Sequence, residues 1–271
     1  AQTAVGAAQR VLTTCIRAID YMPPVDPSFG DYLRALVTAD MDLARDQGAG
    51  YRVAFAEAFA ARGIYPPNVR SAGPESLCWK APAGPVQSAR LNDFIRTLDL
   101  AAYIESDRRR AFAAAKDNAR RLHDWMEANL DEAMARDLGL DFSPDADGRR
   151  TPFEVHSVRP AQRSTAEGET RIDVVAVITQ RRDALLDPAQ PALGSFSFRG
   201  GCTLLLDRGF GTDPIRYAII RPVWNKDREA RVRAHLQTAA GGLNRLYGVV
   251  GMTENREPFA AFHRGLAGEQ G

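Results

Sequence analysis

The feature that most limits the fold of this chain is a change of hydrophobic period near residue 150. Before it, apolar residues recur at helical spacing. The predicted helices span residues 3–21, 29–43, 51–62, 92–100 and 105–136. After it, β-branched and aromatic residues dominate short runs, which is typical of strands. The sequence therefore predicts an α+β fold: an N-terminal helical region followed by a four-stranded antiparallel sheet with a covering helix.

The boundary between the two patterns falls in the turn-rich stretch 143–150 (SPDADGRR). We expect a helical region over residues 1–142, an antiparallel α+β region over 151–240 and a Gly-rich tail over 241–271. The first strand is led by Phe153, Val155 and Val158. The other predicted strands are 171–179, 196–206 and 215–223, and residues 225–240 form the covering helix. Strands that follow one another without helices between them favour an antiparallel meander.

Charge and composition limit the partners and the compartment. The 35 basic and 34 acidic residues give a net charge of +1, which lacks the basic excess of a nucleic-acid-binding protein. Every apolar run is shorter than the ~18 residues of a membrane span, so we expect no membrane partner. Three widely spaced cysteines favour a reducing compartment such as the cytoplasm. The chain begins within a helical pattern, which we interpret as a truncation, and upstream signals would not be visible.

Three consecutive segments carry a family resemblance. They are a helix that ends before a Pro/Asp turn (VLTTCIRAIDYMPP), a helix led by an aromatic residue (FGDYLRALVTADMDL) and, after a Gly loop, YRVAFAEAFAARGI. Their order over residues 3–69 resembles the C-terminal helical subdomain of thermolysin-like (gluzincin) zinc metallopeptidases. The matching positions are Phe29, Arg34, Ala35, Ala39, Asp42, Leu43, Val53, Phe55, Phe59, Gly63 and Ile64. The later blocks VVAVITQRR and FSFRGGCTLLLD are similar to the C-terminal region of bacterial metallopeptidase-like proteins.

The resemblance implies a hydrolase homologue whose catalytic residues are elsewhere. In the family, HExxH on one helix and a Glu on the next hold zinc, and both helices precede the segment matched here. None of the four histidines, His123, His156, His235 and His263, is followed by Glu. We therefore assign no catalytic and no metal residue, and expect zinc only if an upstream HExxH exists. The implied partner is an upstream catalytic region of the same protein, without which this chain is inactive.

A candidate ligand site lies in the third predicted strand. Arg199, Gly200 and Gly201, with Arg182 from the preceding strand, could form a backbone nest for a carboxylate or phosphate. A bulge or a tight strand crossing explains the two glycines equally well. The alternative function is thus a binding or scaffold module that recognises a protein partner or acidic ligand through an Arg-rich sheet. Cys202 lies beside this site, and we expect it to be a buried, inert thiol.

Two further expectations concern packing and cations. Residues 143–154 overlap a calcium-loop pattern, but Ser143 replaces the first ligand, so a solvated turn is expected. In the segment that resembles the peptidases, five apolar residues should interlock two antiparallel helices. These residues are Phe29, Leu33, Leu36, Phe55 and Phe59.

Overall fold

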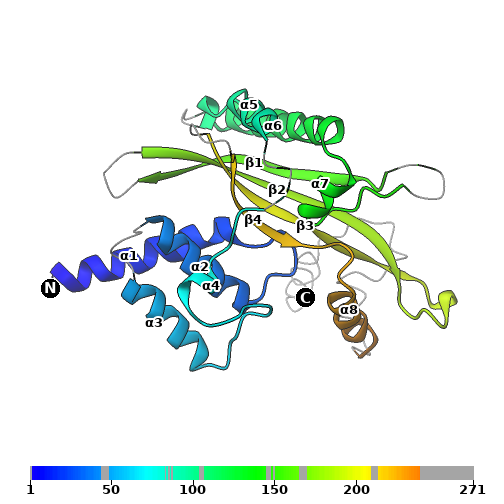
Figure 1. Cartoon of the computed structure of the whole chain (residues 1–271), viewed down its shortest axis with the longest axis horizontal. Helices are drawn as coiled ribbons and strands as arrows, with labels where there is room; N and C mark the ends of the chain where they lie inside the picture. The colour runs from blue at the N-terminus through cyan, green and yellow to red at the C-terminus, as the bar shows by residue number, and fades with distance from the viewer. Residues whose placement is uncertain are drawn as a thin grey trace, which may run out of the picture. The chain divides into compact units, whose positions relative to one another are not determined.

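The computed structural model (Figure 1) divides the chain into two compact units. It describes residues 2–43, 49–82, 84, 86, 88–103, 107–144, 148, 150–164, 170–208 and 213–238. The first unit comprises Ala1–Gln180 and Gly200–Pro222, and the second comprises Arg181–Arg199 and the chain from Val223 onward. The tail predicted over 241–271 lies outside the described residues.

The α+β fold predicted from the sequence is confirmed. The described helices are α1 (Gln2–Ala18), α2 (Phe29–Leu43), α3 (Ala49–Ala60), α4 (Pro74–Leu77), α5 (Ala89–Arg96), α6 (Arg108–Asn129), α7 (Glu132–Asp137) and α8 (Lys226–Thr238). The strands are β1 (Phe153–Ser164), β2 (Thr170–Leu185), β3 (Ser195–Asp207) and β4 (Ile215–Arg221). They form one antiparallel sheet in the order β1-β2-β3-β4, the meander that the sequence favours.

Local side-chain chemistry sets the limits of α2 and α3. Ser28 and Asp31 form a capping box: the Asp31 N–H donates to Ser28 Oγ at 3.2 Å, and the Ser28 N–H donates to Asp31 Oδ2 at 2.8 Å. After α3, Gly63 takes a left-handed conformation (φ 69°) and the Ile64 N–H donates to the Phe59 carbonyl at 3.0 Å. This is a Schellman stop, in which glycine has no steric penalty.

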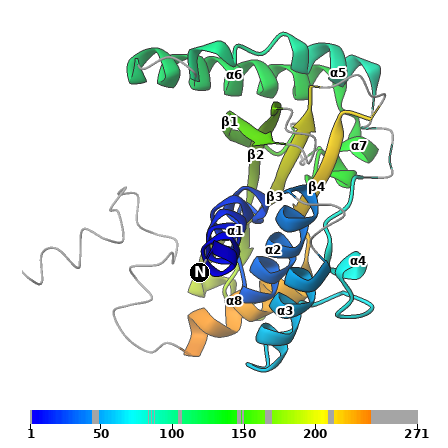
Figure 2. The same ribbon diagram turned by 90° about the vertical axis from the view of Figure 1, so that its left-hand side faces the viewer.

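The first unit has a sheet covered on both faces (Figures 1 and 2). One face packs against α5, α6 and α7. Its strand residues include Val158, Val174, Ala176, Ile178, Cys202, Leu204 and Leu206, and its helix residues include Leu91, Ile95, Leu122, Met126 and Ala135. The other face packs against α1, α2 and Trp79, through Val175, Leu205 and Ile219. Because neighbouring strand residues point to opposite faces, two cores share one set of strands.

Helix α2 packs against the sheet and against α3 and α4. Ala35, Leu36 and Ala39 lie in the core with the sheet, whereas Leu33 and Val37 contact the cluster that includes Ala56 and Leu77. Phe55 and Phe59 are half-buried against both clusters. The prediction for Phe29 is wrong: its side chain is 72% exposed. Phe29 is the first residue of α2, next to the Ser28 cap, and its side chain does not enter the helix interface.

The second unit has a small core of its own. It contains the end of β2, the start of β3 and helix α8. Ala184, Phe196 and Phe198 are buried there, and Val232 and Leu236 of α8 pack against them. The rings of Phe196 and Phe198 meet edge to face, with centroids 6.5 Å apart.

Candidate functional site

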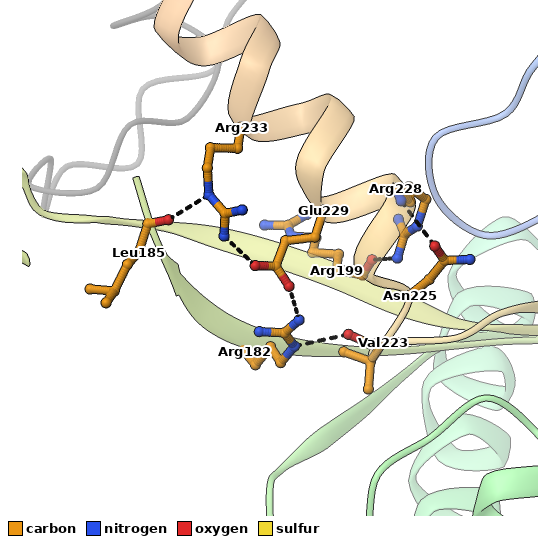
Figure 3. Close-up of polar contacts among 8 residues, drawn as sticks. All are labelled: Arg182, Leu185, Arg199, Val223, Asn225, Arg228, Glu229 and Arg233. Atoms are coloured by element: carbon orange, nitrogen blue, oxygen red, sulfur yellow. Dashed lines mark hydrogen bonds and ion pairs between the residues drawn. The ribbon is translucent and has the colours of Figure 1, made fainter. Parts of the chain in front are cut away.

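The predicted ligand residues are divided between the two units. Arg182 and Arg199 belong to the second unit, whereas Gly200 and Gly201 belong to the first. Arg182 and Arg199 are part of an arginine cluster around Glu229 of α8 (Figure 3). The cluster residues are Arg182, Arg199, Arg228, Glu229 and Arg233.

Glu229 is the acidic centre of this cluster. Its carboxylate accepts hydrogen bonds from Arg182 Nη2 and Arg233 Nη2 (Figure 3). Partial burial acts to raise the pKa of Glu229, but the hydrogen bonds and charges of the two arginines outweigh it and lower that pKa overall. Glu229 is therefore held in its ionised form.

Three further guanidinium donors of the cluster reach main-chain carbonyl oxygens. Arg182 Nε donates to Val223 at 2.9 Å, and Arg233 Nε donates to Leu185 at 3.0 Å. Arg228 Nη2 donates to the carbonyl of Arg199, whose own side chain is exposed. The cluster thus links α8 to β2, β3 and the segment that precedes the helix.

Gly201 has a structural role in the first unit. Its φ is 142°, and a Cβ at this position would lie 2.1 Å from the Ile178 carbonyl oxygen on β2. This geometry agrees with the tight strand crossing weighed from the sequence. Next to it, Cys202 is fully buried, and burial raises the pKa of its thiol. The expectation of a buried Cys202 is confirmed.

Acidic residues of α2 form a buried network that the sequence analysis missed. Asp42 accepts hydrogen bonds from the hydroxyls of Tyr21 at 2.6 Å and Tyr217 at 2.8 Å. Arg216 of β4 donates one Nη to Asp42 and the other to Asp173 of β2, the latter at 2.8 Å. Burial and the Asp42 carboxylate raise the pKa of both tyrosines, so both remain hydrogen-bond donors.

Two other carboxylates of α2 are also paired with arginines. Asp40 accepts from Arg10 of α1 at 2.8 Å and from Arg52 of α3 at 3.3 Å. Asp31 accepts from Arg221 of β4. These acids therefore tie α2 to α1, α3 and the sheet. The sequence did contain a signal for this network, namely acidic residues inside an otherwise apolar helix. Buried charges are tolerated only when they are paired, so each of these acids predicts a basic partner.

Helix α1 and the residue after it carry an exposed apolar stripe. Val5, Leu12, Ile16 and Ile19 have 59–65% of their surface exposed. Their spacing of seven, four and three residues places them on one helix face. The opposite face is occupied, because Cys15 and Ala18 pack into the core beneath the sheet. Within the described part of the chain, this stripe remains uncovered.

A groove of about 500 Å³ lies between α6 and the edge strand β1. Its apolar lining includes Phe112, Ala115, Ala119, Phe153 and Val155. Its polar lining includes Lys116, Arg120, His123, Glu154 and His156. Sequence periodicity could not identify this groove, because it depends on how α6 sits beside the strand.

No metal centre is found among the described residues: they contain no group of three or more His, Cys, Asp or Glu side chains placed to hold an ion. His263 and two acidic positions of the calcium-loop pattern, Asp145 and Asp147, lie outside those residues, whereas the third, Glu154, lies in β1. No helix in the described ranges is long and apolar enough to cross a membrane. Searches of protein-family models, curated proteins and solved structures gave no match to this chain.

Proposed function

We propose that this chain is the non-catalytic C-terminal portion of a thermolysin-like zinc metallopeptidase homologue. The sequence resemblance over residues 3–69 leads to this proposal. The helices in that stretch support it, because α2 begins at Phe29 and α3 is followed by a Gly63 stop, as in the family pattern. Several matched residues also have structural roles: Ala35 and Ala39 pack in the core, and Asp42 accepts a hydrogen bond from Arg216.

The exposed stripe of α1 is the observation that carries the proposal. A water-exposed helix in a globular protein places polar residues on its outer face, whereas α1 places Val5, Leu12, Ile16 and Ile19 there. Complete burial of one such side chain contributes about 1.5–3 kcal/mol. Four of them on one face suit contact with another structural element. We assign this face to the upstream zinc-binding region, for which α1, α2 and α3 would form the floor of the cleft.

In this proposal the chain supplies support and no catalytic residue. Zinc and the general base would come from an upstream HExxH segment, because no histidine of this chain is followed by Glu. The Arg10–Asp40 ion pair and the Tyr21–Asp42 hydrogen bond fix α1 and its following turn against α2. That rigidity would hold the stripe in place for its partner.

Reading the coding sequence upstream of Ala1 tests the proposal. An HExxH motif within a few hundred residues, in the same reading frame, is the expected result. A start codon immediately before Ala1 would contradict it and favour the binding or scaffold module instead. The chain alone is expected to bind no stoichiometric zinc and to cleave no peptide. Near one zinc per chain, measured by metal analysis after purification without chelator, would also contradict it.

We also propose a cytoplasmic location. Cys15, Cys78 and Cys202 are all free, and their wide spacing in sequence suits a reducing compartment. Fractionation of cells that make the native protein would test this, and recovery from the periplasm or medium would contradict it.

A further inference from the structure

One wall of the groove between α6 and β1 is the edge of the sheet. β1 is an edge strand, since the sheet order places only β2 beside it. Part of its outer edge is already blocked: the Tyr103 hydroxyl donates to the Val158 carbonyl at 2.6 Å, and Pro160 has no N–H to offer. The stretch that lines the groove, residues 153–157, precedes both of these features.

A β-bulge marks this same stretch. The pairing with β2 shifts between Val155 and Ser157, which leaves His156 as the extra residue. Its Nε2 lies 2.6 Å from Thr179 Oγ1, so the imidazole is anchored to β2. Bulges are common at sheet edges and beside binding sites, where they redirect side chains.

The opposite wall is an apolar face of α6. Phe112 is 72% exposed, and one and two turns further along the helix Ala115 and Ala119 leave room for an approaching chain. Phe153 lines the groove on the strand side and stacks on His123, with ring centroids 4.5 Å apart. An extended chain lying here would turn every second side chain toward this apolar surface.

The two walls of the groove differ in charge: the strand wall carries Glu154, whose carboxylate lies 3.7 Å from His156 Nε2, whereas the helix wall is basic and favours acidic peptide residues. Lys116 is exposed and forms no ion pair with another described residue. The exposed Arg108 and Arg109 lie about one turn before Phe112 on the same helix. Arg120 is already balanced by Asp117 and Asp124, with N–O distances of 2.8 and 3.4 Å. Arg120 already has acidic partners on α6. A carboxylate of a bound peptide could therefore form an ion pair with Lys116 instead.

We propose that this groove binds an extended peptide that alternates apolar and acidic residues and adds to the edge of β1 as a fifth strand. Main-chain hydrogen bonds to residues 153–157 would give affinity, and Phe112 and Lys116 would select the side chains. The proposal concerns the first unit alone and does not depend on the peptidase assignment.

The test is a fluorescence-anisotropy titration of the full chain with a fluorescein-labelled octapeptide of alternating glutamate and valine. We expect saturable binding at least tenfold tighter than for the lysine–valine counterpart. Phe112→Ser and Lys116→Glu should each weaken binding at least fivefold. Phe29→Ser and Lys80→Glu are matched controls, because Phe29 is equally exposed (72%) and Lys80 is an exposed lysine outside the groove. These controls should bind like the parent chain.

A second probe distinguishes strand addition from nonspecific binding through the side chains. The same octapeptide N-methylated at alternate residues keeps its side chains but loses half of its N–H donors, and it should bind at least tenfold more weakly. Circular dichroism melts establish that each variant is folded. Absence of saturable binding up to 1 mM probe, equal losses in the control variants, or equal binding of the methylated probe would each overturn the proposal.

Discussion

At the scale of single residues, buried charge organises the contact between α2 and the sheet. Asp42 and Asp173 are almost fully buried, yet each reaches Arg216. Burying an ion costs several kcal/mol, so removing one partner exposes that cost in full. The Tyr21 and Tyr217 hydroxyls add two further donors to Asp42. A conservative change at Asp42 should therefore be much more harmful than the same change on the surface.

We expect Asp42→Asn to lower the free energy of unfolding by about 3–5 kcal/mol, since it removes a buried ion-pair partner. Asp117→Asn is the control, because Asp117 pairs with Arg120 on the surface of α6 with 52% of its side chain exposed. The loss there should be much smaller, because solvent screens an exposed ion pair. Urea denaturation measures both, and similar small losses would show that the Asp42 network contributes little.

Gly201→Ala should destabilise the first unit by about 2–4 kcal/mol, because backbone strain and a clash with Ile178 occur together. The control is Gly6→Ala, in the second turn of α1, where an added Cβ meets no atom within 4 Å. That change should be neutral or stabilise by up to ~1 kcal/mol. Thermal melts that show no difference between the two variants would contradict the tight crossing of β2 and β3.

At the scale of elements, the sequence predicted what local signals encode. The apolar period predicted the limits of α2, and the β-branched runs predicted all four strands in order. The break between α6 and α7 was missed, because Asp131 acts as a new N-cap for the Met134 N–H inside a continuous helical pattern. The partners of Asp42 and the groove beside β1 are non-local, so periodicity could not reveal them.

The attachment of α8 in the second unit should depend on pH. Arginines lower the pKa of Glu229 below its ordinary value of about 4.3. A lowered carboxyl pKa stabilises the folded state above the unfolded pKa, and that contribution is lost as the pH falls through the folded pKa. Hydrogen exchange, corrected for intrinsic rates, should show α8 protection falling below about pH 4.3.

We expect Glu229→Gln to remove the pH dependence of hydrogen-exchange protection in α8. Its α8 should be less protected than the parent helix at pH 7 and should show no added loss from this group in acid. Asp227→Asn, in the exposed first turn of α8, is the control and should keep the parent's acid response. An acid response unchanged by Glu229→Gln would place the titrating group elsewhere.

At the scale of the whole molecule, the helical segments and the strands of the first unit belong together. Leu122 and Met126 of α6 pack in one cluster with Val174 and Cys202, and Leu36 of α2 packs in the other with Val175. The helices α1, α2 and α3 are therefore built onto a sheet that lies outside residues 3–69. The α1 stripe remains exposed on this helical layer, and the proposed function assigns it to the upstream region.

The most direct measurement of that assignment is maleimide labelling of a cysteine placed in the stripe. Leu12→Cys, in a background with Cys15 and Cys78 changed to serine, should react in this chain as an exposed thiol. In the longer protein with its HExxH region, we expect the rate to fall at least tenfold. Ala128→Cys, on the exposed side of α6, should react equally in both proteins. Equal labelling of Leu12→Cys in the two proteins would contradict the docking of α1 on a catalytic region.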